Sequence, residues 1–233
     1  MIVSHAQRFI FFHNPKCAGT SFRNALHPYH DDKATFWGPI YSPYFCNYID
    51  HTHLRLWELA ALFPKLFDAA GRDYRSVIFV RNPYTRFLSA VAEHFKKFER
   101  HVHLEDLSSL EQQAVVTKFV ERSLNIREIL ADWTYIHFSP QIWFIMLGDR
   151  VIPRRIVPMD SDGAFMNRAI SYLNVSTIPL PHYNRSPLDL GHLLAVPRIV
   201  SFIQEFYAVD FEFLLALPEL AGLAVLPVSP SVR

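Results

Sequence analysis

Two short segments of the chain combine a basic side chain, hydroxyl groups and a helix start, which together could bind an anion. The first is Pro15-Lys16-Cys17-Ala18-Gly19-Thr20-Ser21, here called the Pro15 turn, and the second is Arg81–Ser89, here called the Arg81 turn. A strand-like apolar run precedes each segment. A cationic side chain beside the N–H groups of a helix start binds phosphate or sulfate groups. The sequence therefore predicts two anion-binding turns.

The Pro15 turn has the features of a strand-to-helix junction. Residues 8–13 form a β-prone run that ends where Pro15 cannot donate to a sheet. Gly19 lets the backbone approach a ligand, and Thr20–Ser21 supply hydroxyl groups and helix-capping oxygens. Lys16 comes before Gly19 instead of directly after it, so the nucleoside-triphosphate loop pattern does not fit. We expect a related geometry in which backbone N–H groups and Lys16 surround a phosphate.

The Arg81 turn repeats this arrangement. Residues 76–80 read as a buried strand, Arg81 lies at its carboxyl end, and Pro83 suits the first turn of a helix. Ligands of parallel sheets bind at the carboxyl ends of the strands, so Lys16 and Arg81 could flank one nucleotide.

The two motifs together resemble those of sulfotransferases that use 3′-phosphoadenosine 5′-phosphosulfate (PAPS), in the branch with carbohydrate O-sulfotransferases and many small bacterial homologues. In that family a P-K-x-x-G-T-S loop holds the 5′-phosphosulfate and an R-N-P-x-x-R-x-x-S element holds the 3′-phosphate. The resemblance implies PAPS as donor and 3′,5′-diphosphoadenosine (PAP) as product. It implies donor contacts from Pro15, Lys16, Cys17, Ala18, Gly19, Thr20, Ser21, Arg81 and Ser89.

Weaker similarities extend along the chain, at residues 50–53, 137–141, 182–186 and 206–211. The loop with Asn184, Arg185 and Ser186 is a candidate to close over the nucleotide, and an ordinary Asn/Ser turn is the alternative. His137 and Gln141 are candidates to face the acceptor.

Sulfuryl transfer to a hydroxyl needs a base for the acceptor proton and a cation for the charge that builds on the leaving phosphate. The resemblance favours His53 as the base, and Lys16 is the cation. A histidine that caps or packs at the following helix start is the alternative reading of His53. His51 is the rival base, and in an extended segment both imidazoles would point the same way.

The chemistry requires no metal, and we expect none. His101, His103, Glu105 and Asp106 superficially resemble a ligand cluster, but without further ligands at a recognisable spacing a solvated loop is favoured. Asp160 could serve a magnesium-dependent enzyme, but a role at the following helix start is favoured.

Composition is compatible with one substantial core. The chain has 233 residues, half of them apolar, and a formal net charge of +1, which gives no general reason to bind nucleic acid or anionic membranes. No linker marks a boundary, so a single domain over residues 1–233 is expected. With no membrane-length apolar run and a first strand that starts within ten residues, a cytoplasmic protein with free Cys17 and Cys46 is expected.

The pattern predicts strands at 8–13, 76–80 and 150–159, with helices at 20–28, 54–70 (broken at Pro64), 84–99, 109–124, 126–134, 163–173 and 193–216. Residues 36–48 read as an aromatic, Pro-rich loop. This order indicates an α/β fold with a P-loop-like parallel sheet, helices on both faces and further helices in the middle and C-terminal parts.

The sequence thus favours an enzyme that transfers a sulfuryl group from PAPS to a hydroxyl of a small molecule or glycan. Two alternatives stay open. One is a non-catalytic nucleotide-binding protein, and the other is a P-loop phosphotransferase, which would need a Walker lysine and a magnesium-binding acid. The sequence leaves the acceptor and the oligomeric state undefined.

Overall fold

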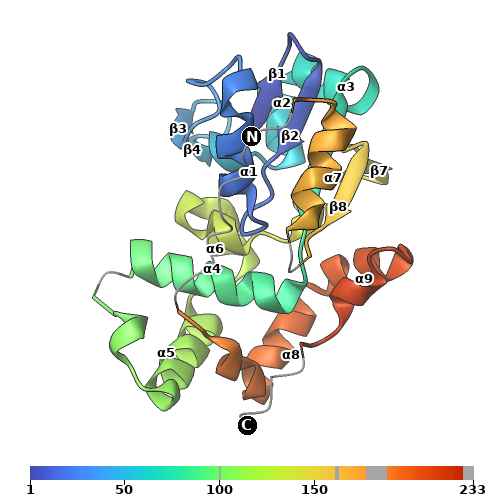
Figure 1. Ribbon diagram of the computed structural model, residues 1–233. Coiled ribbons are helices and arrows are strands. Elements are labelled where there is room, and N and C mark those ends of the chain that lie inside the picture. The colour runs from blue at the N-terminus through green and yellow to red at the C-terminus, as the bar shows by residue number, and fades with distance from the viewer. Residues whose placement is uncertain (100, 161–162, 177–187, 228–233) are drawn as a thin grey trace. The chain divides into compact units, whose positions relative to one another are not determined.

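The computed structural model describes residues 1–99, 101–160, 163–176 and 188–227 (Figure 1). The chain divides into two compact units. The first comprises Met1–Val80 and Gln141–Asn184, and the second comprises Arg81–Pro140 and Arg185–Arg233.

The first unit is built on a four-stranded sheet of order β1-β2-β5-β8. Its strands are β1 (Ile2–Ser4), β2 (Phe9–Phe12), β5 (Arg75–Val80) and β8 (Arg155–Pro158). Strands β2, β5 and β8 are parallel, as the sequence predicts, with Phe11 opposite Val77 and Phe79 opposite Val157. Strand β1 pairs with β2 in the antiparallel direction.

Helices cover both faces of this sheet. Successive strand residues point to opposite faces, so neighbouring residues of one strand contact different helices. On one face, Phe11 and Phe79 pack into a buried cluster with Phe22 of α1 (Gly19–Leu26) and Phe165 of α7 (Ala164–Leu173). On the other face, the Ser76 hydroxyl donates to the Ala70 carbonyl of α3 (Pro64–Arg72) at 2.8 Å. The predicted α/β class with a parallel sheet between helices is confirmed for this unit.

The segment between α1 and α3 contains elements that the sequence does not reveal. A hairpin of β3 (Pro39–Ser42) and β4 (Asn47–Asp50) lies in the predicted loop 36–48. The 3-10 helix His51–His53 follows directly, and α2 (Leu56–Leu62) then ends before Pro64, as predicted. The unit also contains the hairpin β6 (Met146–Leu147) and β7 (Arg150–Val151) and the 3-10 helices His27–Tyr29 and Gln141–Phe144.

The described part of the second unit is helical (Figure 1). Its α-helices are α4 (Pro83–Lys97), α5 (Ser109–Arg122), α6 (Ile126–Ala131), α8 (Pro197–Phe206) and α9 (Ala208–Ala216). Its 3-10 helices are Leu104–Asp106, Trp133–Phe138, Gly191–Ala195 and Ala221–Ala224. The single helix predicted over 193–216 is wrong, since α8 and α9 are separated at Tyr207.

In the described parts of the chain, no helix has both the length and the apolar character needed to span a membrane.

Candidate active site

The Pro15 turn connects the carboxyl end of β2 to α1 through an unusual backbone. Lys16 and Ala18 both adopt left-handed conformations, with φ of 63° and 57°. Ala18 is the N-cap of α1 and has no side chain that could accept from the first turn. The N–H groups at the start of an α-helix have no acceptor within the helix, so α1 presents them beside Lys16. This arrangement suits an anionic group.

Gly19 is the first residue of α1, and the space around it explains why it is glycine. A Cβ atom at this position would lie 2.0 Å from Cδ2 and 2.2 Å from Nε2 of His13. The imidazole of His13 therefore packs directly on the start of α1. Any larger residue would displace either the helix or the His13 ring.

The Pro15 turn is fixed from beneath by buried polar contacts. Asn14 donates through Nδ2 to the Phe79 carbonyl of β5 at 2.9 Å and to Oε1 of Gln141 at 3.2 Å. The Cys17 thiol donates to the same Gln141 oxygen and to the Pro15 carbonyl, each at 3.5 Å. Cys17 is fully buried, so its thiol supports the turn from within and does not face a ligand. Gln141 is 2% exposed and holds the turn. The expectation that Gln141 faces the acceptor is therefore corrected.

His53 lies beside the Pro15 turn, and its hydrogen bond defines its tautomer. Its Nδ1 is 2.8 Å from the His13 carbonyl oxygen, and the two imidazole centroids are 4.2 Å apart. Since a carbonyl only accepts, Nδ1 carries the proton and Nε2 keeps the lone pair. Burial lowers the pKa of His53 to about 4, the Lys16 charge acts in the same direction, and Asp50 opposes both. His53 is therefore neutral at pH 7.

His51 has different surroundings from His53. Its Nδ1 lies 2.9 Å from the Thr35 carbonyl oxygen, and its ring meets Phe63 edge-on at 5.6 Å. The segment is a 3-10 helix and not extended, so the condition for two parallel imidazoles is not met. The two histidines bind carbonyls from separate segments, and His53 is the one that contacts His13, two residues before the Pro15 turn.

A buried ion pair supports the His53 segment. Arg55 Nη1 lies 2.8 Å from Glu58 Oε1, and the backbone N–H of Arg55 donates to Glu58 Oε2 at 2.8 Å. Asp50 accepts from the N–H of Thr52 at 2.9 Å and closes the turn from the other side. These contacts set the direction in which the chain passes His53 into α2.

The Arg81 turn opens the second unit and differs from the Pro15 turn. The side-chain oxygen of Asn82 accepts from the N–H groups of Tyr84 at 2.9 Å and Thr85 at 3.3 Å. The start of α4 is thus capped by the Asn82 side chain. The predicted presentation of its N–H groups to an anion is therefore wrong. An anion at this turn would therefore have to be held by side chains.

Arg81 and Ser89 lie along one side of α4. Arg81 Nε donates to the Thr85 hydroxyl at 3.0 Å, which directs the guanidinium along the helix. Ser89 lies one turn beyond Thr85, on the same helix face. Both Arg81 and Ser89 are half-buried. A guanidinium and a hydroxyl thus lie toward the same side of α4.

Arg86 belongs to the interior of the second unit. It is 1% exposed, donates through Nη2 to the Ser139 carbonyl at 2.6 Å and lies 5.9 Å from the centre of the Tyr207 ring. The Tyr207 hydroxyl in turn donates to the Phe138 carbonyl at 3.0 Å. An arginine in the first turns of a helix is more often a surface group, but here the fold supplies carbonyl and ring partners from distant segments.

Comparison with known proteins decides the family. The sulfotransferase family model matches residues 1–153, which include both turns and His53. The chain belongs to the sulfotransferase family. Searches of curated proteins and of solved structures found no significant match to the chain. This sulfotransferase is accordingly a transferase, and its two motifs lie within the matched region.

Other predicted positions of this sulfotransferase have mixed outcomes. Asn184, Arg185 and Ser186 lie outside the described residues. Asp160 accepts from the Phe165 N–H at 3.3 Å in the first turn of α7, so its predicted role at a helix start is confirmed. Across the described segments, no three His, Cys, Asp or Glu side chains gather as they would around a metal ion.

Proposed function

We propose that this sulfotransferase moves a sulfuryl group from PAPS to an acceptor hydroxyl, with His53 as the general base. The observation that carries the proposal is the bond between His53 Nδ1 and the His13 carbonyl. It fixes Nε2 as the basic nitrogen next to a helix start suited to a phosphosulfate. His13 links the two parts, because its carbonyl binds His53 and its ring packs on Gly19.

In the proposed reaction, His53 Nε2 removes the proton of the acceptor hydroxyl as that oxygen forms a bond to sulfur. The bond between sulfur and the 5′-phosphate oxygen breaks, and its electron pair leaves with PAP. Lys16 and the first N–H groups of α1 stabilise the charge that develops on the phosphate, as a P-loop-like turn does. The neutral state of His53 suits this role, since a protonated imidazole could not accept the hydroxyl proton.

The Arg81 turn is proposed to hold the 3′-phosphate of the donor. Arginine pairs with phosphate through two parallel N–H donors, and Ser89 adds a hydroxyl on the same face of α4. The acceptor is proposed to carry a hydroxyl group on a small molecule or a sugar.

The 3′-phosphate assignment makes PAP a better ligand than adenosine 5′-monophosphate. At one hundred times its dissociation constant, a ligand adds about 2.7 kcal/mol to the free energy of unfolding. We expect PAP to raise the melting temperature more than the monophosphate does at equal concentration. Arg81→Ala should weaken PAP binding about ten- to a hundredfold by removing a charge-assisted pair of roughly 1.5–3 kcal/mol, and thermal shift assays with calorimetry measure both effects.

The matched control is Arg122→Ala, an exposed arginine on α5 of the same unit, which should leave PAP affinity unchanged. Equal shifts by both nucleotides in the wild-type protein would remove the 3′-phosphate from the Arg81 turn. So would unchanged PAP affinity in a folded Arg81→Ala protein.

A further inference from the structure

A cleft of about 680 Å³ opens in the first unit, away from the Pro15 turn. His5 and Tyr74 line it, and they come just before β2 and β5, at the amino ends of these strands. The Pro15 turn follows the carboxyl end of β2. The cleft and the proposed active site therefore lie toward opposite ends of the parallel strands.

One side of the cleft is apolar. Phe36 is 1% exposed and Leu66 is buried, while Phe63 completes an aromatic pair with Phe36 at 5.1 Å between ring centroids. The volume is within the range of small-molecule sites, which bury most of a ligand against apolar and aromatic side chains. This side suits a flat apolar ring.

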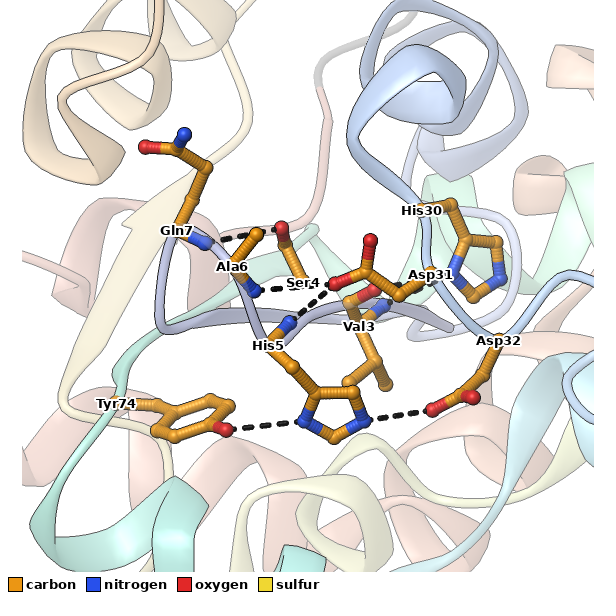
Figure 2. A network of polar contacts seen from close by, with 9 residues as sticks. All are labelled: Val3, Ser4, His5, Ala6, Gln7, His30, Asp31, Asp32 and Tyr74. Atoms are coloured by element: carbon orange, nitrogen blue, oxygen red, sulfur yellow. Dashed lines mark hydrogen bonds and ion pairs between the residues drawn. The ribbon is translucent and has the colours of Figure 1, made fainter.

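The other side carries a chain of three hydrogen-bonded side chains (Figure 2). His5 Nε2 lies 2.8 Å from Asp32 Oδ2, and His5 Nδ1 lies 3.0 Å from the Tyr74 hydroxyl. Because a carboxylate only accepts, Nε2 carries a proton toward Asp32. In the neutral imidazole Nδ1 is then an acceptor, and the Tyr74 hydroxyl donates to it. The lone pairs of the Tyr74 oxygen remain to accept a hydrogen bond from a ligand.

Hydrogen bonds to the backbone of His5, Asp32 and Tyr74 hold these three residues in place. Asp31 Oδ2 accepts from the N–H groups of His5 at 2.5 Å and Ala6 at 3.2 Å (Figure 2). The Asp32 carbonyl accepts from the N–H groups of Thr35 and Phe36, and the Tyr74 N–H donates to Ala69 of α3 at 2.8 Å. The polar side of the cleft is thus ordered before any ligand binds, which reduces the entropy lost on binding.

From these features we propose that the cleft binds a small aromatic molecule that carries a hydroxyl group. The ring packs against the half-buried Phe63, which Phe36 supports from within, and the hydroxyl donates to the Tyr74 oxygen. The cleft also borders His51, since Thr35 and Phe63 line it and both contact that imidazole. A bound ring therefore changes the environment of His51, which gives a readout that does not depend on catalysis.

The test uses 4-fluorophenol and fluorobenzene as probes, followed by fluorine NMR titration of the full chain. We expect 4-fluorophenol to bind about two- to tenfold more tightly than fluorobenzene, the gain from one neutral hydrogen bond. Tyr74→Phe should abolish this preference and leave fluorobenzene binding unchanged. Tyr48→Phe, an exposed tyrosine of the β3–β4 hairpin, is the control and should keep the preference. The ring signals of His51 should shift during the 4-fluorophenol titration.

The proposal is overturned if 4-fluorophenol does not bind, or if the two probes bind equally. It is also overturned if Tyr74→Phe keeps the preference, or if His51 signals do not respond. Binding that His53→Gln weakens and Tyr74→Phe does not would place the probe at the proposed active site instead. None of these outcomes depends on sulfuryl transfer, so the cleft and the proposed reaction are tested separately.

Discussion

Replacing His53 by glutamine lowers turnover about 10²- to 10⁴-fold and leaves donor affinity nearly unchanged. A general base acts on the acceptor proton and not on the nucleotide, so its loss appears in the chemical step. Glutamine can still donate to the His13 carbonyl, which preserves the turn, but it cannot accept a proton at neutral pH. Single-turnover transfer measures the step, and calorimetry with PAP measures the donor site.

His51 and His27 provide the comparison for this result. His51→Gln should cost less than His53→Gln, because His51 binds Thr35, whereas His53 binds His13 beside the Pro15 turn. His27→Gln changes an exposed side chain and should have no effect. If His51→Gln is the inactive protein and His53→Gln keeps its turnover, the base is misassigned.

The pH profile of the wild-type enzyme gives a second readout of the same residue. His53 must be neutral to act, and its pKa is lowered to about 4, mainly by burial. Activity should therefore rise as the pH increases through about 4 and reach its plateau well below pH 6.5, where an unperturbed histidine would titrate. An acid limb in kcat/KM centred near pH 6.5 would contradict a buried His53 base.

The second large effect concerns stability at the ion pair beside His53. Arg55→Leu should lower the free energy of unfolding by about 3–5 kcal/mol, because it leaves the buried Glu58 carboxylate without its partner. Burial is the main cause of both pKa shifts in this pair, raising the pKa of Glu58 and lowering that of Arg55. Desolvation thus dominates at each partner. Urea unfolding of the variant measures the loss.

The double variant Arg55→Leu with Glu58→Leu separates the pair from its isolated partner. It should recover most of the stability, since an apolar pair of similar volume often replaces a buried ion pair at little cost. If the double variant is as unstable as Arg55→Leu alone, the loss comes from packing against Trp57 and Trp143, over which the guanidinium lies at 5.6 Å.

Much of the first unit could be predicted because its signals are local. The apolar runs at 8–13 and 76–80 carry strand-forming residues, and Pro64 breaks the helical pattern where α2 ends. The β3–β4 hairpin could not be read in the same way. Pro39 and the exposed Tyr41 and Tyr48 give it neither an apolar face nor a regular alternation.

The candidate site was predictable in its residue types but not in its support. Lys16 and Gly19 follow from the motif of the Pro15 turn, and His53 follows from the family resemblance. The partner of His53 is a backbone carbonyl far away in the sequence, and Gln141 reaches Asn14 from a separate segment. Such contacts depend on tertiary packing, which leaves no local pattern. The burial of Arg86 likewise depends on Ser139, which lies far away in the sequence.

The central claim is sulfuryl transfer to a hydroxyl, and the most direct measurement follows labelled sulfate. Wild-type protein is incubated with sulfur-labelled PAPS and with sugars, phenols and aliphatic alcohols in turn, and the label on each acceptor is quantified together with PAP. We expect label on at least one hydroxyl acceptor, in equal amount to the PAP formed, and about 10²- to 10⁴-fold slower transfer by His53→Gln. Tight PAP binding with no label on any acceptor, or equal transfer by His53→Gln, would contradict the account.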